Sequence, residues 1–240
     1  MEEEIMRFLL ISLISFPLWA AENSIEIDTK GSNSSIYIDQ IGSGNTAKVW
    51  CGLSNGTYST HSCSSATIDI DQDGTSNVAR AYSQLISHTG NEYKIEQTGD
   101  DNFGYIDADD DSNDMDIVSN GNNNDAEIYM QGDNNVYSIT QTGNDKEGEV
   151  RAFGDSSNFS INQSGSGEHY AKIYASNSAD NNDASIAQTG SGDHYMQLNF
   201  YTDDYNVTAS QSGTTNKSIT ATYNCVTNCT KTVVINQFDQ

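Results

Sequence analysis

Apolar and polar residues alternate in short stretches along the chain, and most of these stretches end at a glutamine. Apolar residues stand two and four positions before the glutamine, as Tyr137 and Ile139 do before Gln141. Side chains of a β-strand point to opposite faces in turn, so this alternation predicts a half-buried strand. A glycine two positions after the glutamine, followed by a polar run, predicts a turn.

A second alternating stretch follows each turn, for example Ala171 and Ile173, and clusters of Asn, Asp, Ser and Gly close the unit. One unit therefore predicts a strand, a tight turn, a second strand and another turn. The recurring glutamines are Gln40, Gln72, Gln97, Gln141, Gln163, Gln188, Gln211 and Gln237. The turn glycines are Gly42, Gly74, Gly99, Gly121, Gly143, Gly165, Gly190 and Gly213, where Ser119 replaces the glutamine before Gly121.

The spacing of these positions predicts how the units are arranged. With Ser119 included, successive spacings are 32, 25, 22, 22, 22, 25, 23 and 26 residues, a period with insertions that is typical of a stacked array. A unit of this length cannot bury its apolar face alone and must stack on its neighbours. We predict an all-β fold, a β-solenoid of roughly eight and a half turns over residues 34–240. Its predicted core column is Ile38, Ile70, Ile95, Ile117, Ile139, Ile161, Ile186 and Ile235.

Stacked glutamines at one position of the unit can form a ladder, because each amide both donates and accepts along the axis. Such ladders are typical of cross-β assemblies. Composition alone favours disorder, since the chain is 35% hydrophobic with a mean hydropathy of −0.60 and a net charge of −24. The fixed phase of the apolar pairs argues against disorder, which needs no register. The acidity also disfavours nucleic acid as a partner.

The first residues predict export. Met6-Arg7 and the apolar run "FLLISLISFPLWAA" predict a secretory signal peptide over residues 1–21, cut after Ala20 or Ala21. The acidic "MEEEI" before it fits poorly, so Met6 is the favoured start. A membrane anchor is the weaker alternative because the run is too short to span easily. No later segment is apolar enough for a bilayer, so we expect no membrane span.

Four cysteines suit an oxidising compartment. Cys51 and Cys63 bracket most of the insertion in the first spacing, and Cys225 and Cys229 bracket the insertion in the last. We therefore expect two local disulfides, Cys51–Cys63 and Cys225–Cys229. The alternative is pairing between subunits that stack head to tail. Zinc is less favoured because the chain has no CxxC pair or adjacent histidines.

Candidate chemistry elsewhere is weak. The run Asp107–Asp116 has partial EF-hand spacing for calcium, but Ser112 replaces the required glycine and Val118 the final glutamate, which favours a solvated acidic turn. His169 and His194 occupy matching turns and should lie close together, where a pH-sensitive or metal-binding role competes with simple repeat duplication. We find no catalytic triad and no phosphate loop, and we predict no enzyme and no cofactor.

The repeat resembles the curlin family, the subunits of bacterial curli fibres, whose unit reads Ser-x5-Gln-x-Gly-x-x-x-Asn-x-Ala-x3-Gln. The segment "SSIYIDQIGSGNTAKVW" carries Ser34, Gln40, Gly42, Asn45 and Ala47 in those places. The resemblance covers residues 34–240. The chain departs from the pattern because the second glutamine is mostly lost and the turn asparagine is missing from the units of Gln141, Gln163 and Gln188.

The resemblance implies a secreted subunit of an extracellular fibre at the bacterial cell surface, in adhesion and biofilm. It implies self-assembly or a curlin major subunit as partner, a curli-type outer-membrane channel with accessory proteins, and a secretion segment in residues 22–33. The stretch "KIEQTGDDNFGYIDADDDSND" and the half-built last unit "TVVINQFDQ" favour the minor, nucleating subunit, although its basic last repeat is not reproduced. The alternative is a monomeric secreted β-solenoid adhesin or binding protein, which should cap its ends.

Overall fold

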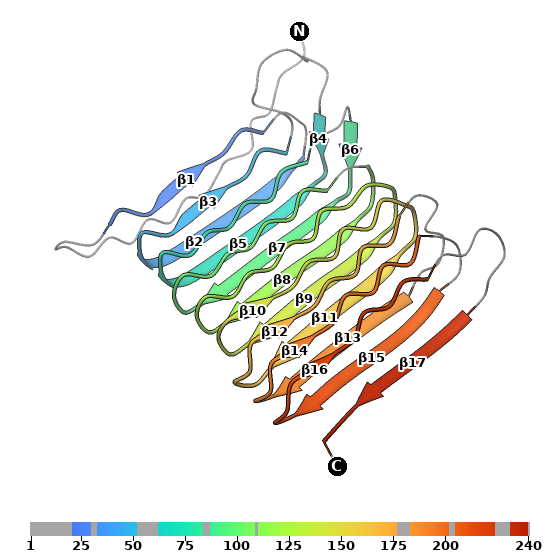
Figure 1. Cartoon of the computed structure of the whole chain (residues 1–240). Coiled ribbons are helices and arrows are strands. Elements are labelled where there is room, and N and C mark those ends of the chain that lie inside the picture. The colour runs from blue at the N-terminus through green and yellow to red at the C-terminus, as the bar shows by residue number, and fades with distance from the viewer. Residues whose placement is uncertain are drawn as a thin grey trace, which may run out of the picture.

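The computed structural model describes residues 21–29, 33–51, 62–83, 87–108, 110–176, 183–201, 205–223 and 231–239. These residues form an all-β, parallel β-solenoid of about eight turns with roughly 23 residues per turn, which confirms the predicted fold class. The turns follow one another from the blue N-terminal end to the red C-terminal end, and each turn lies beside the next (Figure 1). The described residues include no helix long and apolar enough to cross a membrane.

One face of the solenoid is a regular parallel sheet of nine strands, which we call the first face. Every glutamine position of the repeat falls in one column of this sheet, since the register pairs Gln40 with Gln72 and continues in step to Gln237. Its strands are β2 (Ser35–Ser43), β5 (Thr67–Thr75), β7 (Glu92–Thr98), β8 (Asp114–Asn120), β9 (Val136–Thr142), β11 (Asn158–Ser164), β13 (Asp183–Gly190), β15 (Tyr205–Gly213) and β17 (Lys231–Gln237).

The opposite layer, the second face, is less regular. Isolated parallel bridges carry it through the middle turns, from Thr46 through Val78, Phe103 and Asp125 to Glu147. Its strands are β1 (Ser24–Glu26), β3 (Thr46–Lys48), β10 (Lys146–Glu147), β12 (His169–Tyr170), β14 (His194–Tyr195) and β16 (Lys217–Ser218). A small pair outside both faces joins β4 (Ser62–Ser64) to β6 (Ser87–Thr89).

The sequence predicted a second full strand in each unit, and the structure gives only short strands and bridges there. Several residues of this layer have left-handed backbone, among them Ile106 (φ 84°), Glu149 (φ 119°) and Arg151 (φ 85°). A left-handed residue turns its peptide groups out of the pleated arrangement, so the hydrogen-bond ladder is interrupted. The alternation of side chains survives this change, and Ile106, Ile128 and Ile173 remain fully buried.

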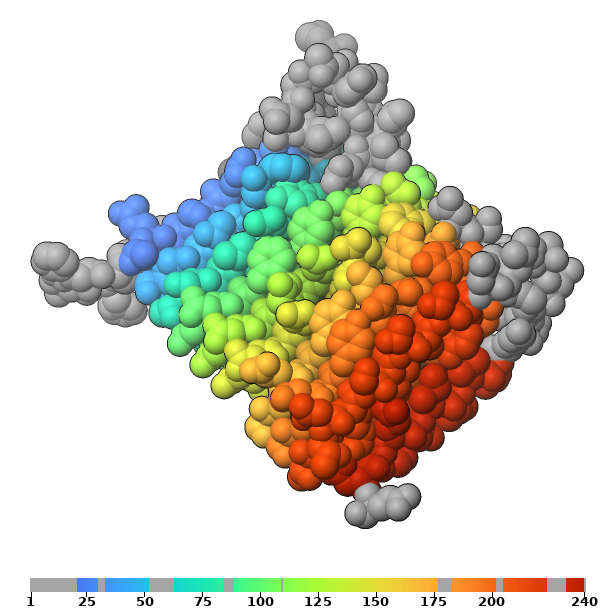
Figure 2. Space-filling view, viewed as in Figure 1, coloured from blue at the N-terminus to red at the C-terminus, as the bar shows by residue number. Residues whose placement is uncertain are grey.

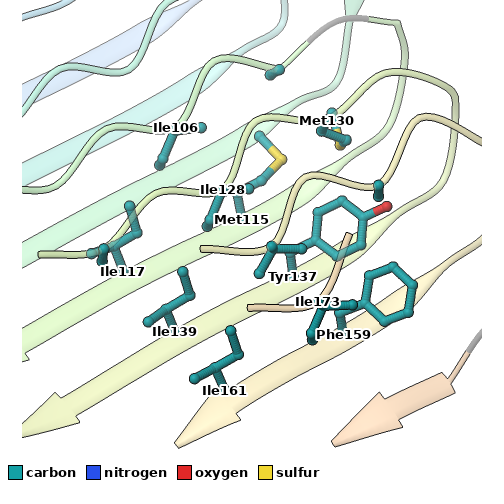
Figure 3. Packing of buried hydrophobic residues seen from close by; sticks show 14 of the residues in the cluster. Ile106, Met115, Ile117, Ile128, Met130, Tyr137, Ile139, Phe159, Ile161 and Ile173 are labelled. Atoms are coloured by element: carbon teal, nitrogen blue, oxygen red, sulfur yellow. The ribbon is translucent and has the colours of Figure 1, made fainter. Parts of the chain in front are cut away.

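The core is a thin apolar layer between the two faces. Figure 3 shows Ile117, Ile139 and Ile161 above one another in a column, with Ile128 and Ile173 entering from the opposite layer. All the predicted core isoleucines except the last are buried, and Ile235 in the final strand is partly buried. Aromatic side chains form a second column, in which the rings of Tyr137 and Phe159 stack with centroids 5.4 Å apart.

The solenoid begins earlier than the sequence predicted. The repeat pattern begins at residue 34, but Ser24–Glu26 pairs in parallel with β3, and Ile25 packs against the core. Asn23 donates from its side chain to the Gly42 carbonyl at 3.3 Å, just as later asparagines donate to the glycine carbonyl of the turn that follows. At the N-terminal end, the second face therefore extends one layer further along the solenoid axis than the first face.

Candidate assembly interface

The glutamine column forms a hydrogen-bonded ladder along the solenoid axis. Each Nε2 donates to Oε1 of the next glutamine, at 2.7 Å from Gln40 to Gln72 and 2.8 Å from Gln72 to Gln97. The ladder resumes after one gap, with distances of 3.1, 2.9, 2.9 and 2.8 Å for the steps through Gln141, Gln163, Gln188, Gln211 and Gln237. The glutamines between the two end strands are buried. Each one therefore satisfies its amide through its neighbours, which ties adjacent turns to one register.

Ser119 interrupts this ladder. Its hydroxyl donates to Gln141 Oε1 at 3.0 Å, so it serves the following turn. The Gln97 amide donates to the Val78 carbonyl of the second face. The gap separates a two-step ladder from a four-step ladder without changing the register of the strands around it.

The turn glycines are required by geometry. All eight have left-handed φ angles, from 100° at Gly42 to 135° at Gly74. A Cβ at Gly143 would lie 2.3 Å from the Gly165 carbonyl oxygen, and the other turns are as close. Only glycine avoids both the unfavourable φ and this backbone contact, so the column of glycines is a consequence of close stacking.

Asparagines form two further ladders that the sequence did not reveal as such. In the first, the backbone N–H of Asn77 donates to Asn45 Oδ1 at 2.9 Å, and the pattern continues through Asn102 and Asn124. Each Nδ2 in turn donates to the glycine carbonyl of the next turn, as Asn124 does to Gly143 at 2.8 Å. The second ladder, at the other edge of the first face, contains Asn91, Asn113 and Asn135. The fixed position of these asparagines in each repeat is the sequence signal that could have revealed the two ladders.

Lys146, His169 and His194 occupy the places where the repeat lacks its turn asparagine. Lys146 is fully buried, its Nζ donates to two backbone carbonyls at 2.6 Å each, and burial lowers its pKa. The rings of His169 and His194 stack with centroids 4.9 Å apart, each with Nε2 3.0 Å from a carbonyl of its own turn. Burial lowers the pKa of His169 to about 4, so the ring is neutral at physiological pH. These side chains replace the asparagine as hydrogen-bonding groups of the turn.

The structure contains the Cys51–Cys63 disulfide, which closes off the first insertion. Both cysteines are fully buried. The second expected pair, Cys225–Cys229, lies outside the described residues.

Within the described part of the chain, carboxylates of the acidic run at residues 107–116 accept hydrogen bonds from their own turn and from neighbouring turns. Asp107 accepts from the Tyr105 hydroxyl at 2.7 Å. Asp110 accepts from the Gly132 amide at 3.0 Å, and Asp111 accepts from the Thr89 amide at 2.7 Å. Asp109 is not among the described residues. The described residues offer no group of three or more metal-ligating side chains placed to hold an ion.

The two ends of the solenoid differ from its interior. At the N-terminal end, Gln40 Oε1 is buried but has no hydrogen-bond partner within the described ranges, since no preceding glutamine donates to it. At the C-terminal end, β17 is the last strand of the first face, and no described strand of the second face follows β16. Asp239 takes the place of a turn glycine, and its carboxylate accepts from the Thr214 and Thr215 hydroxyls and amides. This carboxylate caps the last turn but leaves the edge of β17 open.

The fold and these columns define the chain as a parallel β-solenoid with stacked glutamine and asparagine ladders. A scan against models of protein families finds no match for it, and neither does a search of curated proteins.

Proposed function

We propose that this chain is a secreted structural subunit of a curli-like extracellular fibre, with a nucleating or accessory role. The observation that carries the proposal is that β2 and β17, the outer strands of the first face, each lack a partner strand on their outer edge among the described residues. Strand edges present unpaired N–H and C=O groups, which most proteins protect and which fibre subunits use to add the next chain. The glutamine ladder repeats the same bond on both sides of the gap at Ser119, so an added chain would meet the pairing already used inside the stack.

The acidic surface fits a subunit that must stay soluble until it assembles. Asp39 and Asp71 face outward at matching positions of adjacent first-face strands. Burial raises the pKa of Asp71, as do the charges of Asp69 and Asp39. A raised carboxyl pKa means that this group opposes folding once it is ionised, so its cost disappears as the pH falls. Salt screens the same repulsion, and we expect salt or mild acid to speed assembly.

The resemblance in the repeat extends this proposal to location and partners. We infer export through a curli-type outer-membrane channel, a site at the bacterial cell surface, and contact with a curlin major subunit or with further copies of this chain. The Cys51–Cys63 disulfide joins cysteines only 12 residues apart in the sequence, which is compatible with passage of a disulfide-containing chain.

A second function is a monomeric secreted adhesin or binding protein. The observation in its favour is Asp239, which satisfies the amides of the last turn as a cap would. It leaves β17 without a partner strand on its outer edge among the described residues.

The test follows thioflavin T fluorescence after the unfolded chain is diluted into buffer, alone and at trace amounts with excess curlin major subunit. Faster fibre growth of the partner would identify a nucleator, and fibres of this chain alone would identify a bulk subunit. A stable soluble monomer that leaves the partner unaffected would refute the fibre proposal and favour the adhesin.

A further inference from the structure

We propose that two copies of this chain join head to tail through one specific joint. In this joint β17 of one copy pairs in parallel with β2 of the next, and β1 of the next copy completes the half-turn that β17 leaves open. This inference rests on the proposed function and specifies how its fibre would be built. Three independent features of the described residues carry it.

The first feature is the stagger of the two ends. At the N-terminal end the second face carries β1, while the first face starts one layer later with β2 (Figure 1). At the C-terminal end the first face carries β17, and no second-face strand follows β16 in the described ranges. The two ends lie at opposite extremes of the stack (Figure 2). A half-layer missing at each end, on opposite faces, means that two copies fit together as one complete turn.

This composite turn would bury apolar side chains that lie only partly buried in one copy. Val233 and Ile235 point inward from β17, and Ile25 and Ile27 accompany β1. Within a complete turn such residues face each other across the core. The joint would bring these two pairs into the same layer, where each covers the other.

The second feature is the outward surface of the two terminal strands. In the column that contains Tyr37 and Val234, the interior strands carry polar residues: Asp69, Lys94, Asp116, Ser138, Ser160, Ser185 and Thr208. The terminal residues are instead apolar and exposed, at 45% for Tyr37 and 61% for Val234. The column of Ile41 repeats the pattern. Ile41 is exposed at 55%, and Phe238, which directly follows the last residue of β17 and comes next in its register, is exposed at 57%.

Apolar residues at the ends of polar columns point to burial against another molecule. In the proposed register, Val234 of one copy lies beside Tyr37 of the next, and Phe238 lies beside Ile41. Neighbouring residues in such a ladder are close enough for side-chain contact. A second copy therefore covers all four residues at once.

The third feature is the polarity of the glutamine ladder. Every step donates toward the C-terminal end, so Gln237 receives a bond from Gln211 and directs its own amide to the Ser218 carbonyl at 3.3 Å. An amide nitrogen has two hydrogens, and one remains for a further acceptor. Gln40 Oε1 of the next copy is the buried acceptor that lacks a donor within the described residues. The same register that pairs the apolar residues brings Gln237 to Gln40.

The experiment uses the secreted chain, expressed with its own leader, and two variants that each disable one end. Tyr37→Lys/Ile41→Lys alters the N-terminal end, where the lysines meet Asp69 and Asp73 of their own chain. Val234→Lys/Phe238→Lys alters the C-terminal end. A matched control, Ser138→Lys/Thr142→Lys, places the same charges in the same two columns on the interior strand β9. Far-UV circular dichroism and urea midpoints check that each variant folds.

We expect each end variant to elongate at least about tenfold more slowly than the wild type, since two apolar contacts are lost at every joint. The control should elongate at the wild-type rate. A mixture of the two end variants should give a discrete 1:1 dimer by analytical ultracentrifugation, because one intact end of each kind remains. Hydrogen exchange on wild-type fibres adds a measurement without substitutions, in which β2 and β17 should gain protection while β9 does not change.

Fibres that elongate normally from either end variant would overturn the joint, as would dimers within one variant pool or the absence of dimers in the mixture. Unchanged exchange at β2 and β17 in the fibre would overturn it as well. If the wild type accelerates a curlin partner but never associates with itself, the proposed function stands and this joint is wrong. If the wild type does neither, both are wrong.

Discussion

The contact between Ile139 of the first face and Gly148 of the second face tests whether the two layers pack directly on each other. Ile139 is fully buried. A Cβ added at Gly148 would lie 2.9 Å from Ile139 Cγ2 and 3.2 Å from its Cδ1. Gly148 does not have a left-handed φ angle, so an alanine at this position does not force an unfavourable φ. Its new methyl group would instead press against the Ile139 side chain. The substitutions Ile139→Ala and Gly148→Ala are therefore expected to depend on each other.

The magnitudes follow from packing. Ile139→Ala removes a fully buried side chain and should lower the free energy of unfolding by about 2–5 kcal/mol. Gly148→Ala should cost about 1–3 kcal/mol, because the new methyl group overlaps a β-branched side chain that has few alternative rotamers. In the double variant the methyl group enters the space left by the isoleucine. The combined loss should fall short of the sum by about 1–2 kcal/mol.

Urea unfolding of dilute monomer, followed by circular dichroism and tyrosine fluorescence together, measures the four free energies of this cycle. The two signals must coincide for the values to be comparable, since repeat arrays can unfold in parts. The control pairs Gly148→Ala with Ile95→Ala, two turns away, and should be additive within about 0.5 kcal/mol. If the effects of Ile139→Ala and Gly148→Ala are as additive as those of the control pair, the two faces do not meet at this point and the packing argument fails.

Three further outcomes are expected. Burial lowers the pKa of His169 to about 4, so its contribution to stability should be lost as the pH drops from about 6.5 toward 4, while Asp125, whose pKa burial raises to about 6, acts in the opposite direction. The wild type should therefore lose more stability over this range than His169→Asn in pH-dependent urea titrations, and identical pH profiles of the two chains would contradict the assignment. Reduction of Cys51–Cys63 should cost about 2–4 kcal/mol, and in the Cys51→Ser/Cys63→Ser variant a reductant should lose most of its effect on the urea midpoint. Ser119→Gln should extend the ladder to Gln141 and add about 1 kcal/mol of stability, whereas a lower urea midpoint would show that the site cannot hold an amide.

The sequence predicted the features that repeat. Alternation before each glutamine identified the first-face strands, because burial of one side of a strand selects apolar residues at every second position. The glycine column was also visible, since a left-handed turn under a close neighbour excludes every other residue. The sequence did not show the role of Lys146 and His169. Only the register of the strands shows that both side chains stand in an asparagine ladder and bond to turn carbonyls.

The sequence by itself determined the period, the strand that carries the glutamines and the inward-facing residues, since these depend on local alternation and on repetition. Tertiary structure alone decided the irregular course of the second face and the inclusion of β1 in the stack. Ser24–Glu26 lacks the glutamine and the turn glycine that mark a unit, and its place in the stack shows only in its pairing with β3. The staggered ends follow from that pairing, because the layer in which a strand lies depends on its partner and not on its own residues.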